Sequence, residues 1–165
     1  MNRTTSIPVA AQTELSISHR ARGLLLGTFG DVFFAIWSTK PTPELFELER
    51  SGLAAAVHAR PGRALFLCVV SPNADPPEQA ERDASARMIT SHGSKLLGTA
   101  CVVEGSGFRA AITRTVLTGI VLFIRTPSPV TFFDSVNGAA LWMQRRTRGC
   151  DLSQLASEVD QIRFS

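Results

Sequence analysis

Three neighbouring positions, Ser106, Gly107 and Arg109, have residue types and spacing that suit the binding of an anion. With Gly105 they form a short Gly-Ser-Gly turn between an apolar run and a helix-like segment. Such a turn can present backbone N–H groups at a helix start, where phosphate or carboxylate is attracted. The same residues also suit an ordinary strand-to-helix turn capped by Ser106, because the run is shorter than a phosphate-binding loop.

A second group of polar residues, Ser71, Asn73 and Asp75, follows the apolar run 64–70. In open α/β sheets, ligands gather outside the carboxyl ends of the strands. The two groups are therefore the candidate ligand-binding or partner-binding residues, and we expect a pocket between 71–75 and 105–109.

The remaining chemistry-bearing residues do not form a recognisable centre. Cys68 and Cys101 lie inside apolar runs, where a thiol acts as a small buried hydrophobe, and Cys150 stands alone. The three histidines have no second ligand at metal spacing. We predict no catalytic constellation, no metal site and no cofactor, and the cysteine pattern fits a reducing, cytoplasmic location.

The chain has 165 residues, 44% of them hydrophobic, and a formal net charge of +3. This composition favours one globular domain and argues against disorder. Basic residues cluster only at 145–148, which is better explained as a solvated helix end than as a nucleic-acid stripe. The most apolar stretch, 115–124, is too short for a membrane span, which needs about 20 apolar residues. We therefore expect no nucleic-acid partner and no membrane span.

The order of apolar runs and helical repeats predicts a single α/β domain with a mixed sheet. Runs at 24–29 and 32–39 form a hairpin around Gly30-Asp31, and the chain then alternates between helix and strand. The helix at 43–60 begins at Thr42 and that at 136–148 begins at Ser135, each a good N-cap. The other predicted strands are 64–70, 96–103 and 130–133, and the other helices 77–92 and 108–125.

Two helices have repeats that predict which face they bury. The helix at 43–60 is expected to bury Leu45, Leu48, Gly52, Ala55, Ala56 and Ala59. The helix at 108–125 is expected to be buried on more than one side, along a stripe of Phe108, Ala111, Ile112, Thr115, Val116, Gly119, Ile120 and Phe123.

Both ends of the chain are predicted to lie outside the domain at 21–148. Residues 1–20 are interpreted as a flexible leader, and the lack of acidic residues before Glu14 also fits a mitochondrial-type transit segment. Residues 149–165 are interpreted as an amphipathic tail helix. Its seam of Leu152, Leu155, Val159 and Ile162 is a candidate partner-binding surface.

The order of elements over 22–148 resembles the STAS domain, and is most similar to the bacterial SpoIIAA-like (STAS-like) proteins. The local markers are the Pro-Thr-Pro-Glu-Leu-Phe helix opening, the Leu-Cys-Val-Val strand and the Glu-Gly-Ser-Gly-Phe-Arg turn. The resemblance implies a helix-covered mixed sheet. Antagonists of that family are switched by phosphorylation in an Asp-Ser-Ser/Thr-Gly-like turn. This chain has Ser71-Pro72-Asn73-Ala74-Asp75-Pro76-Pro77 there, so the phosphoswitch is not carried over.

Three hypotheses for function follow. The first is a non-enzymatic, cytoplasmic STAS-like module that binds another protein or itself, as in bacterial regulation. The alternative is a domain that binds a small molecule, an anion or a lipid through the loops after 64–70 and 96–103. The third is an enzyme with spatially assembled residues, for which the sequence offers neither nucleophile nor base.

Overall fold

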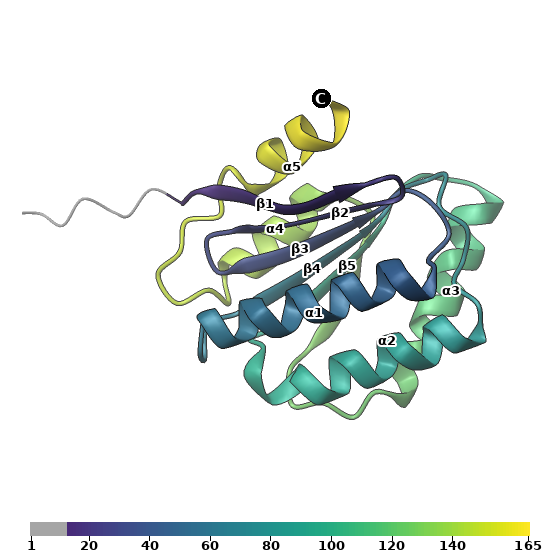
Figure 1. Ribbon diagram of the computed structural model, residues 1–165, viewed down its shortest axis with the longest axis horizontal. Coiled ribbons are helices and arrows are strands. Elements are labelled where there is room, and N and C mark those ends of the chain that lie inside the picture. Colours follow the sequence, from purple (N-terminus) through teal and green to yellow (C-terminus); the bar gives the residue numbers. More distant parts are fainter. Residues whose placement is uncertain (1–12) are drawn as a thin grey trace, which may run out of the picture.

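The computed structural model describes residues 13–165, which form one six-stranded mixed sheet with helices on both faces (Figure 1). The strands lie side by side in chain order: β1 (Leu15–Ala21), β2 (Leu24–Phe29), β3 (Val32–Trp37), β4 (Leu65–Val70), β5 (Thr99–Val103) and β6 (Val130–Phe133). The helices are α1 (Pro43–Ala59), α2 (Gln79–His92), α3 (Phe108–Phe123), α4 (Val136–Gln144) and α5 (Leu155–Phe164), with a 3₁₀ turn at Gly93–Lys95. The predicted α/β class with a mixed sheet is confirmed.

The strand pairing explains why the sheet is mixed. Strands β1, β2 and β3 pair antiparallel through short turns, whereas β3 to β6 pair parallel and are joined by helices. The turn between β2 and β3 contains Gly30 at φ 56°, in the left-handed region that favours glycine. As the continuous apolar runs predict, β3 and β4 are buried on both faces of the sheet.

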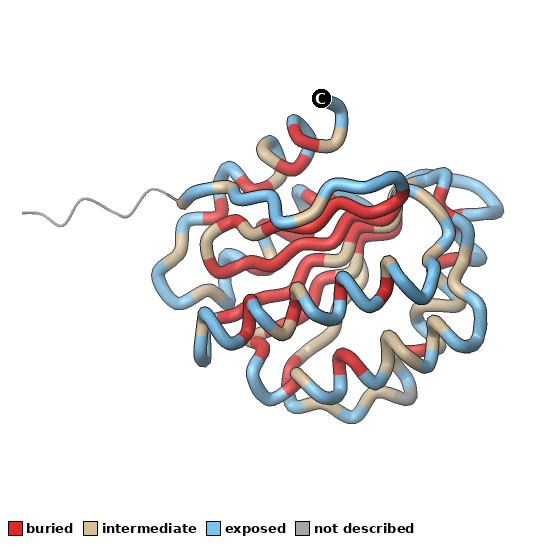
Figure 2. The backbone as a smooth tube through the Cα atoms, in the orientation of Figure 1, coloured by how far each residue is buried: buried red, intermediate tan, exposed pale blue. Residues whose placement is uncertain are grey.

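Each face of the sheet has its own apolar core. On one face, the largest buried groups are Phe33, Phe66 and Trp37 from the strands, packed against Phe46 and Leu53 of α1. On the other face, α4 and α5 cover the sheet. Figure 2 shows buried backbone concentrated in the central strands, with mostly exposed positions along the outer sides of α1 and α2. The two predicted N-caps are confirmed: Thr42 Oγ1 accepts from Leu45 N at 3.3 Å, and Ser135 Oγ from Gly138 N at 3.1 Å.

Parts of both predicted appendages belong to the domain. Residues 15–20, interpreted as part of a flexible leader, lie in the edge strand β1, and residues 1–12 lie outside the described part. The seam of the tail is covered by the chain's own sheet, because Leu152, Leu155, Val159 and Ile162 are all buried in the core that α4 and α5 form with the sheet. The tail surface assigned to a partner is therefore occupied within the chain.

The predicted buried faces of α1 and α3 also need correction. Helix α1 buries Phe46, Glu49, Leu53, Ala56 and Val57. Its true stripe is thus shifted by one position from the predicted one, and Leu48 is exposed.

Helix α3 packs on one side only, through Ala110, Thr113 and Ile120. Phe108, predicted to be inside, is 80% exposed, and Leu122 on the same side of the helix is exposed to the same extent. Helix α3 packs mainly against α2 and β5. No helix in the described residues is long and apolar enough to cross a membrane.

Candidate functional site

An apolar cavity of about 80 Å³ lies between the sheet and helices α1, α2 and α3. Alternate residues of β4 point into it, namely Phe66, Cys68 and Val70, because successive side chains of a strand face opposite sides. The cavity reaches the edge of the sheet where β3 and β4 end, since residues of the following loops also line it. The complete lining adds Trp37, Thr39, Pro41, Phe46, Glu49, Ala74, Asp75, Pro77, Glu81, Ser85, Met88, Ile89, Cys101, Leu117, Ile120, Val121 and Phe132.

Glu49 is the most unusual residue of the cavity, because it is a carboxylic acid inside an apolar stripe. It is only 2% exposed, and its Oε1 accepts a hydrogen bond from Trp37 Nε1 at 3.1 Å. Burial raises the pKa of Glu49 to about 7, and the hydrogen bond from Trp37 offsets only part of that effect. The carboxyl group can therefore change its charge near neutral pH, which is typical of carboxyl groups at functional sites.

Cys68 and Cys101, the cavity cysteines, are direct neighbours across β4 and β5. Burial, followed by the nearby Glu49 carboxylate, raises the pKa of Cys68 well above its usual value and that of Cys101 to about 12. Both side chains line the cavity but stay protonated at neutral pH, so they contribute polarizable apolar surface rather than a nucleophile.

Two surface ion pairs flank the loop end of the cavity. Asp75 pairs with Arg109 at the start of α3, and Lys40 pairs with Glu78 at the start of α2. The hydrogen bond with Glu78 raises the pKa of Lys40 and lowers that of Glu78. Because all four side chains are largely exposed, these pairs contribute little to stability. They do connect the loops that border the cavity.

The structure divides the predicted binding residues between two places. Asp75 lines the apolar cavity and contacts Arg109, whereas Ser71 and Asn73 line a second cavity of about 350 Å³. The pocket expected between 71–75 and 105–109 is thus not one site.

The Gly-Ser-Gly turn does not use Ser106 as a cap. Helix α3 begins after Gly107, and no side-chain hydrogen bond caps its start. Gly105 and Gly107 both have φ 92°, and a Cβ on Gly105 would lie 3.1 Å from Pro72 Cβ. The two glycines are therefore explained by the backbone of the turn itself.

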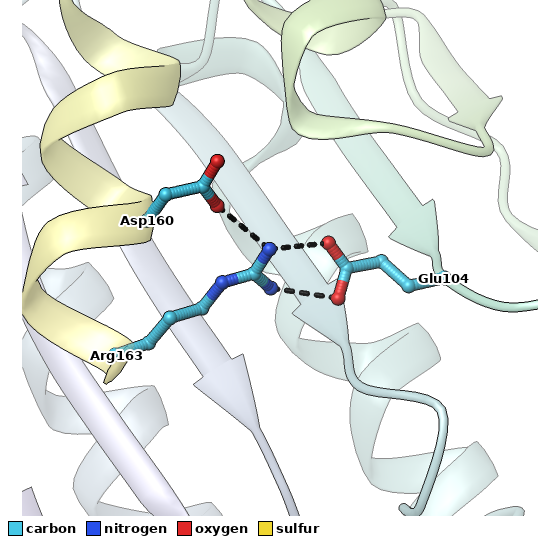
Figure 3. A network of polar contacts seen from close by, with 3 residues as sticks. All are labelled: Glu104, Asp160 and Arg163. Atoms are coloured by element: carbon cyan, nitrogen blue, oxygen red, sulfur yellow. Dashed lines mark hydrogen bonds and ion pairs between the residues drawn. The ribbon is translucent and has the colours of Figure 1, made fainter.

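The second cavity lies at the other face of the sheet, beside α5, and includes Glu104 and Arg163. Figure 3 shows how Arg163 reaches across from α5: its two terminal nitrogens donate to the Glu104 carboxylate at 2.6 and 2.7 Å. It also donates to Asp160 at 2.7 Å on its own helix. Burial lowers the pKa of Arg163, but the bonds to the two carboxylates outweigh it and raise the pKa overall. This two-point contact attaches α5 to the end of β5.

Sequence reasoning missed Glu49 because it placed the buried stripe of α1 one residue away. The positions Phe46, Glu49, Leu53 and Val57 have helical spacing as good as the predicted stripe. The charged residue Glu49 within that second apolar stripe was the signal in the sequence that could have identified this site. No cluster of three or more metal-ligating side chains occurs among residues 13–165.

The arrangement has the chemistry of a binding site. It offers apolar walls, one dehydrated carboxyl group that accepts a hydrogen bond, and protonated thiols.

The fold is similar to that of a solved structure, an uncharacterised protein of the DUF3478 family with a SpoIIAA-like fold from Shewanella loihica PV-4. The two chains share 17% identity at a TM-score of 0.50, and the match covers 79% of this chain and 92% of the other. No family model matches the sequence, and no curated protein matches it significantly. The comparison therefore supports the resemblance stated from the sequence at the level of fold.

Proposed function

We propose that this chain is a non-enzymatic, STAS-like regulatory module that binds a small, mainly apolar molecule in the cavity between the sheet and α1, α2 and α3. The observation that carries the proposal is a dehydrated carboxyl group, Glu49, among apolar walls. Binding sites for small molecules combine such walls with a few placed polar groups. Burying a carboxyl group costs stability, so its presence is best explained by use.

The position of the cavity also supports the proposal. Its loop end lies beyond the carboxyl ends of β3 and β4, where ligands of open α/β sheets bind. Of the six predicted residues, the proposal retains Asp75, which lines the cavity. It replaces the other five by the cavity residues, namely Ser71, Asn73, Ser106, Gly107 and Arg109. It also keeps the cytoplasmic location expected from the cysteine pattern.

The test is a fragment screen against two matched variants of α2. Ser85→Leu places a larger side chain in the cavity, whereas Thr90→Leu adds the same side chain at an exposed position of the same helix. Fragments that bind the wild-type protein should also bind Thr90→Leu and should lose binding to Ser85→Leu. If the two variants retain every fragment equally, the cavity is not the binding site.

A second candidate function, binding of a protein partner, is favoured by the outer side of α3. Phe108, Ile112 and Leu122 are exposed there, which is more apolar surface than a solvated helix usually presents. Removing it with Phe108→Ser and Leu122→Ser should abolish self-association in sedimentation or capture of a specific partner. The control Leu48→Ser, at an exposed position of α1, should have no effect.

A further inference from the structure

The ionisable carboxyl groups of the cavity determine which kind of ligand it can accept. Glu49, Asp75 and Glu81 line it, and no lysine, arginine or histidine within residues 13–165 does so. Asp75 is already paired with Arg109, so Glu49 and Glu81 are the carboxyl groups left to a ligand. A bound carboxylate or phosphate would meet negative charge and find no cation in the lining. A bound cation would meet an opposite charge already held in place.

The hydrogen-bonding groups of the lining also favour a cationic ligand. The bond from Trp37 occupies one of the two Glu49 oxygens, Oε1. Glu81 Oε2 is buried and accepts no hydrogen bond from the described residues. Ser85, one turn further along α2, adds a hydroxyl oxygen. The cavity therefore has acceptors in excess of donors, and a ligand that supplies several N–H donors would satisfy them.

From this geometry we propose that the ligand is a small apolar primary amine whose ammonium group contacts Glu49 and whose hydrocarbon part contacts Trp37 and Phe66. The inference rests on the proposed small-molecule site and names its ligand chemistry. Folding has already removed most water from Glu49. The free-energy cost of dehydration on binding is therefore mainly that of the amine.

The cavity volume limits the size of such an amine. The cavity measures about 80 Å³, well above the roughly 10–15 Å³ that one water needs, so it suits a small ligand with a single ring. Cyclohexylamine is close to this size. Three control compounds have the same ring. Cyclohexanol carries a neutral hydrogen-bond donor, methylcyclohexane has no polar group, and cyclohexanecarboxylate carries a negative charge.

The chain contains a built-in reporter for this series. Of its two tryptophans, Trp37 lines the cavity, whereas Trp142 packs on the opposite face of the sheet. Titration with each probe is followed by the NMR signals of the two indole N–H groups. Specific binding should move the Trp37 signal and leave the Trp142 signal in place.

We expect cyclohexylamine to bind at least about tenfold more tightly than cyclohexanol, because hydrogen bonds to charged groups are the stronger ones. In Glu49→Gln this advantage should disappear while cyclohexanol binding remains, since the amide keeps an oxygen that can accept from Trp37. The matched control is Glu47→Gln on the exposed side of α1, which should retain the preference.

The dependence on pH gives a second readout that needs no variant. The titratable groups close enough to interact electrostatically with Glu49 are Cys68 and Cys101, and both thiols stay protonated below pH 8. Asp75 and Glu81 line the same cavity. Glu49 gains a proton as the pH falls through about 7, so amine affinity should drop about tenfold from pH 8 to pH 6. Affinity for cyclohexanecarboxylate should rise over the same range.

The outcomes separate this inference from the proposed function. If no probe moves the Trp37 signal, the small-molecule site itself is wrong. If cyclohexanol or methylcyclohexane binds as well as cyclohexylamine, or if Glu49→Gln keeps the amine preference, the site stands and the amine assignment is wrong. Tighter binding of the carboxylate at pH 8 would also overturn the assignment.

Discussion

Replacing the buried carboxyl group of Glu49 should change how the stability of the protein depends on pH. Its pKa is raised from the ordinary value of 4.5 to about 7 by burial. Between these two pH values the folded state holds a proton that the unfolded state has released. The free energy of unfolding therefore falls as the pH rises through this window, and it stays level above about pH 7 as far as Glu49 is concerned.

The size of the effect follows from the same shift. One pKa unit corresponds to about 1.4 kcal/mol, so the whole shift from 4.5 to about 7 corresponds to about 3 kcal/mol. In Glu49→Gln this contribution is absent, because the amide does not ionise. Relative to the wild-type protein, the variant should thus gain about 3 kcal/mol between pH 4.5 and pH 8.

The assay is urea unfolding of both proteins, without ligand, at half-unit steps of pH. Taking the difference between the two proteins at each pH removes the contributions of all other titrating groups. Glu47→Gln is the control, because Glu47 is exposed and its hydrogen bond with Arg50 lowers its pKa, so its difference curve should be flat over this range. A curve for Glu49→Gln that changes by less than about 1 kcal/mol would refute the reasoning, since the carboxyl group would then be hydrated and ionise normally.

Three further predictions concern α5 and the cysteines. Leu155→Ala should lower the free energy of unfolding by about 3 kcal/mol because Leu155, the first residue of α5, is fully buried, whereas Leu141→Ala, at an exposed position of α4, should stay within about 0.5 kcal/mol. Urea titration measures both, and equal effects would mean that α5 is not docked. Glu104→Gln should cost about 1–3 kcal/mol, because it weakens the partner of the mostly buried Arg163. By contrast, the exposed Glu78→Gln should have no measurable effect in the same assay. The cavity cysteines should resist alkylation at pH 7 in the folded protein and react once urea is added; rapid labelling of the folded state, detected by mass spectrometry, would contradict their raised pKa values.

Local signals in the sequence were sufficient for most of the sheet and for two helix starts. Continuous apolar runs predicted β3 and β4, and the hydroxyl groups of Thr42 and Ser135 predicted where α1 and α4 begin. These features depend on residues close together in the chain, which is why local patterns identify them.

Tertiary contacts decided the features that the sequence did not reveal. Strand β1 alternates weakly, since most of its side chains are exposed, and only its pairing with β2 makes it a strand. From the sequence alone, the apolar seam of α5 is indistinguishable from a partner-binding surface. The structure shows that the chain's own sheet covers it.

The cavity could not be predicted from the sequence for a related reason. Two apolar stripes of α1 were equally good by spacing, and the one chosen contained no charge. The correct stripe contains Glu49, and its meaning depends on Trp37, Phe66 and Met88, which come from other elements. Only the assembled fold brings these side chains around one carboxyl group.

A crystal structure of the protein soaked with cyclohexylamine at pH 8 would show directly whether the amine enters the cavity. We expect electron density for the ring between Trp37 and Phe66, with the nitrogen within hydrogen-bond distance of Glu49. Density for the amine only elsewhere on the surface, with the cavity unchanged beside Glu49, would contradict the claim that this cavity is the binding site.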